Sequence, residues 1–195
     1  MAVVVVSPKF CAPDVVSLTV RRKVMSMTGG ELTITDPYGA VVLQVKRSVL
    51  SVRRNRRILI GAARQPILSI HEKVLSMHPT WEVFRGDSSS SSDLLFTAKR
   101  CTFLKLRTEM NIFLAGNTAQ QVCDFKMKGS YFDRNCAIYL GNSNTMIAQI
   151  TRKYTVSDVL VGKDTFNITV FPDVDHVFVA ALVVVLDQVH NSDRS

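Results

Sequence analysis

Ten consecutive apolar residues near the C-terminus constrain the fold more than any other feature of the sequence. They run from Val177 to Leu186, and no polar residue interrupts them. A helix that crosses a bilayer needs about 20 apolar residues, so this run is too short to span a membrane. A helix on a protein surface carries a polar stripe, and this run has none. We therefore expect the rest of the chain to bury it on every side.

The run is expected to form a helix from Asp175 to about Asn191. Pro172 ends the preceding strand-like segment, and an aspartate at the start can accept hydrogen bonds from the first free N–H groups. The alanines and leucines of the run favour a helix, whereas its valines oppose one weakly. A strand of this length would be unusual. The side chains expected to form the buried core of this helix are Val177, Phe178, Val179, Leu182, Val183 and Leu186.

Short apolar or alternating segments, separated by turn residues, fill the region between residues 15 and 172. The clearest signal is a hairpin, in which Leu32–Thr35 and Val41–Lys46 alternate with a period of two around the turn Asp36–Gly39. Strands at such regular spacing indicate a β-sandwich or a β-barrel. Thr155–Val161 is helix-like but short, and we expect a loop or a single turn there. Gly86–Asp93 is rich in serine and is expected to be a flexible hairpin loop. Further strands are expected at Leu18–Met27, Val49–Val52, Ile58–Ile60, Ile67–Glu72, Trp81–Arg85, Leu94–Arg100, Lys105–Leu114, Val122–Lys128, Cys136–Leu140, Met146–Lys153 and Phe166–Phe171.

The composition indicates the size and the compartment of the protein. A chain of 195 residues, 47% of them hydrophobic and 21% charged, is expected to form one domain over residues 1–195 with a core at about 15–190. The four cysteines are Cys11, Cys101, Cys123 and Cys136. Their spacing fits no zinc site and favours reduced thiols inside a cell, with two disulfides in a secreted protein as the alternative. Val3–Val6 is too short for the apolar part of a secretory signal. We expect a cytoplasmic monomer without a transmembrane segment, with a peripheral membrane or nuclear location as alternatives.

No constellation of catalytic, metal-binding or cofactor-binding residues stands out in the sequence. His71-Glu72 begins like the helix of a zinc protease, but Leu75 occupies the position of the second metal ligand. Gly162–Asp164 resembles the end of a phosphate-binding loop but lacks the hydroxyl residue after the lysine. The carboxylates are scattered, so no pair is placed for acid–base catalysis. The sequence therefore predicts no catalytic residue, no metal and no cofactor.

Positive charge is the remaining functional signal. The chain has 24 lysines and arginines against 16 acidic residues, a net charge of +8, which favours anionic partners, although solubility alone would also explain it. The candidate anion-binding residues are Arg53, Arg54, Arg56 and Arg57. Guanidinium groups bind phosphate oxygens in pairs, so this cluster at a turn could hold a phosphoinositide headgroup. A solvated loop without a partner is the alternative. Nucleic acid is a weaker fit, because no aromatic RNA-binding motif or basic amphipathic helix accompanies the arginines.

Several segments, taken together, resemble the LURP-one-related family of plant proteins. In chain order they are Lys23–Gly30, Leu32–Gly39, Met77–Gly86, Gly162–Phe166 and Pro172–Asp175, and the resemblance extends from about Ser7 to Asp193. It implies a mainly β, tubby C-terminal-like fold. Such a fold is a closed antiparallel barrel of roughly twelve strands around one buried, hydrophobic C-terminal helix.

The resemblance also bears on function. The superfamily contains the tubby proteins and the phospholipid scramblases, which bind membranes or phosphoinositides. For the LURP-one-related branch itself, the resemblance supplies no activity and no catalytic residue, and the lipid-binding motif of tubby has no positional match here. We therefore expect a non-enzymatic binding or signalling module that recognises phosphoinositides, anionic membrane surfaces or a protein partner. An enzyme whose site is assembled from distant residues and a nucleic-acid-associated regulator are the alternatives.

Overall fold

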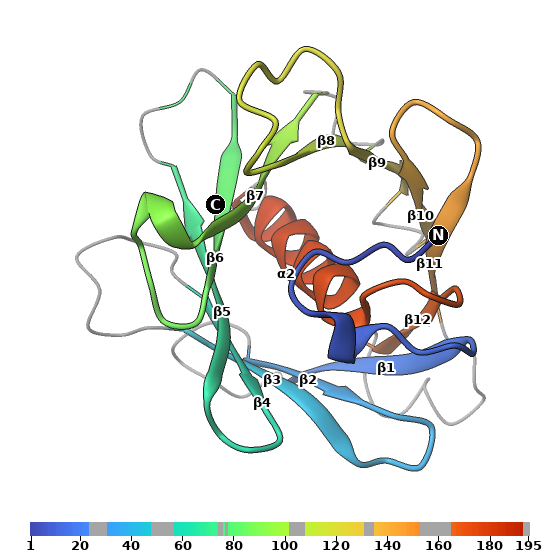
Figure 1. Cartoon of the computed structure of the whole chain (residues 1–195). Coiled ribbons are helices and arrows are strands. Elements are labelled where there is room, and N and C mark those ends of the chain that lie inside the picture. The colour runs from blue at the N-terminus through green and yellow to red at the C-terminus, as the bar shows by residue number, and fades with distance from the viewer. Residues whose placement is uncertain are drawn as a thin grey trace.

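Twelve antiparallel strands form a closed barrel around one helix in the part of the chain that the structure describes (Figure 1). The computed structural model describes residues 1–23, 31–47, 57–73, 76, 78–101, 108–130, 135–152 and 165–192. The strands are β1 (Val16–Lys23), β2 (Glu31–Thr35), β3 (Val41–Arg47), β4 (Arg57–Gly61), β5 (Pro66–Glu72), β6 (Thr80–Arg85), β7 (Leu94–Arg100), β8 (Thr108–Leu114), β9 (Phe125–Ser130), β10 (Asn135–Leu140), β11 (Met146–Arg152) and β12 (Thr165–Val170). The helix is α2 (His176–Ser192). The predicted mainly β fold, a closed antiparallel barrel around a C-terminal helix, is confirmed.

The strands follow one another around the barrel in chain order, and β12 pairs with β1 to close it. Successive strands therefore alternate in direction, which gives the barrel two distinct ends. Asp175 directly precedes α2 at one end, which we call the Asp175 end. Asp187, in the last turns of α2, contacts Arg22 near the end of β1 at the other, which we call the Asp187 end. Odd-numbered strands run toward the Asp187 end, and even-numbered strands run away from it.

The interior of the barrel is occupied by α2. Each residue of the apolar run from Val177 to Leu186 is at most 1% exposed, so the predicted burial of the helix is confirmed. Phe178 packs edge-on against Phe96 on β7, with ring centroids 5.1 Å apart, and lies 4.8 Å from the ring of Phe125. Fully burying one such apolar side chain contributes about 1.5–3 kcal/mol. Packing of α2 against the inner faces of the strands is thus the main source of cohesion.

A buried carboxylate organises the start of the helix. Asp175 is 0% exposed, and its Oδ1 atom accepts hydrogen bonds from the backbone N–H groups of Val177 and Phe178, each at 3.1 Å. Its Oδ2 atom accepts hydrogen bonds from the N–H groups of Val6 at 2.7 Å and Ser7 at 3.1 Å. One side chain therefore caps the helix and also holds the beginning of the chain.

Residues 1–12, which we call the N-terminal strap, cross the Asp175 end of the barrel (Figure 1). The N–H group of Val3 donates to the carbonyl of Asp173 at 2.8 Å, and the Val3 carbonyl accepts from the Asp175 N–H group at 3.0 Å. Arg85, at the end of β6, donates to the carbonyl of Val6 at 2.9 Å. The strap also contains the short 3-10 helix η1 (Pro8–Phe10). These contacts lie outside the core range of about 15–190 that the sequence indicates.

One strand begins later than the sequence predicts. The expected segment was Val122–Lys128, whereas β9 spans Phe125–Ser130. The Asp124 carboxylate accepts hydrogen bonds from the N–H group of Leu114 and the amide of Asn117, each at 2.8 Å, and so stabilises a turn before the strand. The serine-rich segment Gly86–Asp93 does join β6 to β7, but it contains the 3-10 helix η2 (Ser91–Asp93). The expected segments Val49–Val52 and Thr155–Val161 lie outside the described residues.

Candidate functional site

Charged residues of the described strands are sorted between the two ends of the barrel. Acidic residues gather at the Asp175 end, in the hairpin links and just before α2. They are Asp36, Asp87, Asp93, Asp124 and Asp173, and the basic residues found there are Lys9, Arg64 and Arg85. Basic residues gather at the Asp187 end, at or beside the strand termini. They are Arg22, Lys23, Lys46, Arg47, Arg57, Lys73, Lys99, Arg100, Lys128 and Arg152, and the acidic residues found there are Glu31, Glu72, Glu109 and Asp187. The barrel therefore carries opposite charge at its two ends.

The arginine cluster singled out by the sequence lies only partly in the described chain. Arg53, Arg54 and Arg56 belong to residues 48–56, which are outside the described ranges and link β3 to β4 in the sequence. Arg57 is the first residue of β4 and is 6% exposed, because it alternates with buried Leu59 along the inner face of the strand. A side chain so placed is not on an exposed turn.

The Arg22 side chain also stabilises the end of the helix. Arg22 forms an ion pair with Asp187, whose side chain is 3% exposed. Arg100, at the end of β7, is also buried. A guanidinium–carboxylate pair at such a depth fixes the position of α2 relative to β1 and would be costly to break. The Arg22–Asp187 pair therefore has a structural role.

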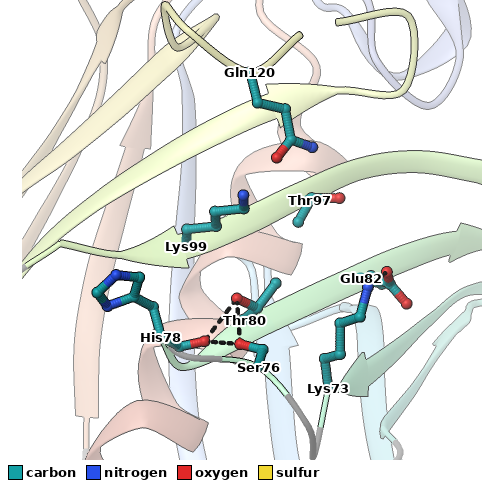
Figure 2. A pocket seen from close by; sticks show the side chains of 8 residues that line it. All are labelled: Lys73, Ser76, His78, Thr80, Glu82, Thr97, Lys99 and Gln120. Carbon is teal, nitrogen blue, oxygen red and sulfur yellow. Dashed lines mark hydrogen bonds and ion pairs between the residues drawn. The ribbon is translucent and has the colours of Figure 1, made fainter. Parts of the chain in front are cut away.

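A polar pocket with a volume of about 240 Å³ lies outside the barrel, over β6 and β7 (Figure 2). We call it the outer pocket. The inner faces of these strands carry Trp81, Val83 and Phe96, so the pocket is separate from the core around α2. Its lining residues come from β6, β7 and two links between strands. They are Lys73, Ser76, His78, Thr80, Glu82, Thr97, Lys99 and Gln120.

The hydrogen bonds in the outer pocket do not form a catalytic arrangement. The Thr80 hydroxyl donates to the carbonyl of His78 at 2.8 Å, and the Ser76 hydroxyl lies 3.0 Å from the Thr80 hydroxyl. An activated serine would instead donate to an imidazole nitrogen. Figure 2 shows the His78 ring turned away from both hydroxyls. Nor do the described residues contain a group of three or more metal-ligating side chains.

No local sequence pattern predicts the outer pocket, because its lining residues are spread from position 73 to position 120. The longest apolar run of the sequence is also too short to span a membrane. Among the described residues, the structure contains no helix long and apolar enough to do so.

Comparison with known proteins gives consistent matches over nearly the whole chain. A family model described as LURP-one-related matches residues 16–187. Protein LURP-one-related 15 from Arabidopsis thaliana is 44% identical over 192 residues, which cover 98% of this chain and 88% of that protein. Protein LURP-one-related 10 from the same plant is 41% identical, with 97% of each chain covered. An X-ray structure of an Arabidopsis thaliana protein, 37% identical, matches with a TM-score of 0.77 over 96% of this chain and 98% of that one. These names state no reaction, ligand or partner.

Proposed function

Because the chain belongs to the LURP-one-related family, for which the matched names state no reaction, we propose that it is a non-catalytic module that binds anionic membranes. The Asp187 end of the barrel is the binding surface. One observation supports this proposal above the others, namely the separation of basic and acidic residues between the two ends. With α2 occupying the interior of the barrel, a partner has to bind on the outside or at an end.

The strength of such binding follows from the exposed basic residues. Each lysine or arginine near an anionic membrane surface contributes about 1 kcal/mol. Lys46 and Lys73 are exposed at the Asp187 end. Arg53, Arg54 and Arg56 belong to the link between the two strands that meet at this end, and we propose that they add to the same surface. A few such contacts give weak, reversible attachment. Salt weakens this attachment, because it screens charge interactions beyond about 10 Å at 0.1 M.

The opposite end sets the orientation of the module. Asp87 and Asp173 are exposed there, and like charges would repel an anionic membrane. The helix dipole stabilises this distribution of charge within the protein, since the acidic residues lie near its positive N-terminus and the basic residues near its negative C-terminus. The module should therefore approach a membrane with the Asp187 end first.

Vesicle sedimentation tests the proposal with two variants that lose the same amount of charge. Arg53→Gln/Arg54→Gln removes two positive charges from the predicted cluster, and Lys9→Gln/Arg64→Asn removes two from the Asp175 end. Binding to vesicles that contain a phosphoinositide should fall roughly 30-fold in the first variant, the equivalent of about 2 kcal/mol. It should be unchanged in the second.

Salt and lipid composition provide the controls. Attachment should weaken as salt increases and disappear on vesicles of pure phosphatidylcholine. Equal binding by both variants, or attachment that does not depend on anionic lipid, would rule out the Asp187 end as a membrane-binding surface.

A further inference from the structure

Lys99 is a cation on the floor of the outer pocket without a carboxylate partner among the described residues. Its ammonium lies over the ring of Phe113, 5.5 Å from the centroid, and this contact holds it in place. The other charged groups of the pocket already form a pair, because Lys73 Nζ and Glu82 Oε1 are 3.2 Å apart. The outer pocket therefore presents one uncompensated positive charge at a defined position.

Two neutral donors lie beside Lys99. Thr97, two residues earlier on β7, is 6% exposed and lines the same pocket. Gln120 extends over the pocket from the link between β8 and β9, and Figure 2 shows its amide oxygen on the side of the Lys99 ammonium and its amide nitrogen on the side of Thr97. The backbone of Gln120 is itself held, since its N–H group donates to the Asn117 side chain at 3.1 Å. The Thr97 hydroxyl and the Gln120 amide have no hydrogen-bond partner in the part of the chain that the structure describes.

An ammonium, a hydroxyl and an amide around one space can serve several acceptor oxygens of a single anion. A phosphoryl group has three such oxygens, whereas a carboxylate has two. The volume of about 240 Å³ is below the range of about 300–1,000 Å³ typical of drug-sized ligands, so the occupant must be small. The Lys73–Glu82 pair provides one donor and one acceptor beside this space, which is suitable for hydroxyl groups.

We propose that the outer pocket binds a small phosphate monoester that carries hydroxyl groups. The phosphoryl group lies among Lys99, Thr97 and Gln120, and the hydroxyl groups of the ligand lie at the Lys73–Glu82 pair. This site shares Lys73 and Lys99 with the Asp187 end, but none of its lining residues belongs to the arginine cluster, so the two proposals can be tested separately.

The first test uses inorganic phosphate and glycerol phosphate as soluble probes, followed by the amide resonances of the protein in two-dimensional NMR. Both probes should shift the amides of Thr97, Lys99 and Gln120 in a saturable way. Lys99→Met, which keeps the apolar stem over Phe113 but removes the charge, should weaken the affinity about tenfold or more. Thr97→Val, which removes only the hydroxyl, should weaken it severalfold.

Matched variants separate the site from general charge effects. Lys46→Met removes one positive charge from an exposed position on β3 and should bind both probes like the native chain. Glu82→Gln should weaken the binding of glycerol phosphate and spare that of inorganic phosphate, because only the ester has alcohol hydroxyl groups to place at this carboxylate. The same spectra report whether each variant is folded.

The outcomes decide the proposal as follows. Saturable shifts that Lys99→Met abolishes and Lys46→Met retains would support it. Absence of binding by both soluble probes to the native chain would overturn it, even if vesicles with phosphorylated lipids bind, since the ligand would then not be a free ester. An equal loss of affinity for the two probes in Lys99→Met and Lys46→Met would also overturn the proposal. The Arg53→Gln/Arg54→Gln variant leaves every lining residue unchanged, so the membrane proposal can fail without affecting this one.

Discussion

Replacing Asp175 tests whether one buried carboxylate joins the N-terminal strap to the helix. Its two oxygens have separate tasks, since Oδ1 accepts the first N–H groups of α2 and Oδ2 accepts those of Val6 and Ser7. Asparagine caps helices about as well as aspartate does. In Asp175→Asn, however, one oxygen becomes an NH2 group that cannot accept the strap hydrogen bonds. Asp175→Ala removes both sets of bonds.

The expected losses in the free energy of unfolding follow from these contacts. Leaving the buried N–H group of Val6 without an acceptor costs about 1–3 kcal/mol, which is the expected effect of Asp175→Asn. Loss of a helix N-cap costs about 1 kcal/mol more, so Asp175→Ala should cost about 2–4 kcal/mol. For a chain of this size each 1 kcal/mol lowers the Tm by about 2–4 °C. Asp175→Ala should therefore lower the Tm by roughly 4–16 °C.

Thermal unfolding followed by circular dichroism measures these changes, and hydrogen exchange at the amides of Val6 and Ser7 locates them. Asp173→Asn is the matched control, because the Asp173 carboxylate is exposed and forms no hydrogen bond within the described residues. The stability of the control should stay within about 0.5 kcal/mol of the native value. A native Tm and native exchange at Val6 in Asp175→Asn would refute the joint role of this carboxylate.

Three further predictions concern the core, the pH and the thiols. Val179→Asp places an unpaired charge at a position that is 0% exposed, so the variant should not fold, and a native melting curve for it would contradict the buried helix. Burial lowers the pKa of His176 from its usual value of 6.5, so the unfolded chain binds a proton more readily. The free energy of unfolding should therefore fall as the pH decreases below about 6.5, down to the folded-state pKa. Urea unfolding of His176→Gln should show a smaller loss of this free energy over the same range. A pH profile identical to that of the native chain would argue against a role of His176 in the pH dependence. Cys101 is exposed, whereas burial raises the pKa of Cys136 to about 12, so alkylation of the native protein should modify Cys101 and spare Cys136 until the chain unfolds. Early modification of Cys136 would show that its environment is open.

The helix and the first hairpin could be predicted because their signals are local. Val179 and Leu182 belong to an apolar run that no surface position can accommodate, so their burial follows from the run alone. The hairpin of β2 and β3 follows from alternation on either side of Asp36–Gly39, where the Asp36 carboxylate accepts hydrogen bonds from the N–H groups of Tyr38 and Ala40, each at 2.9 Å. In both cases the residues that carry the signal are also the residues that make the contacts.

Other features depend on partners that are distant in the sequence. The Asp175 carboxylate meets Val6 across 169 positions, and no local pattern indicates that pairing. The sequence showed that Arg57 is charged, but only the strand register shows that it shares the inner face with Leu59. The outer pocket is a similar case. Nothing in the sequence around Lys99 or Gln120 indicates that the fold brings these two residues into one pocket.

The orientation of the protein on a membrane tests the central claim most directly. A fluorophore is attached either to Cys101, which follows β7 at the Asp187 end, or to a thiol introduced by Tyr38→Cys at the Asp175 end, where Tyr38 is 95% exposed. The Cys11→Ser background removes the half-exposed thiol of the strap, and Cys101→Ser is added for the second label. Phosphoinositide vesicles that carry a quencher in their headgroup region should quench the label at Cys101 and leave the Tyr38→Cys label bright. Equal quenching of both labels, or stronger quenching of the Tyr38→Cys label, would contradict binding through the Asp187 end.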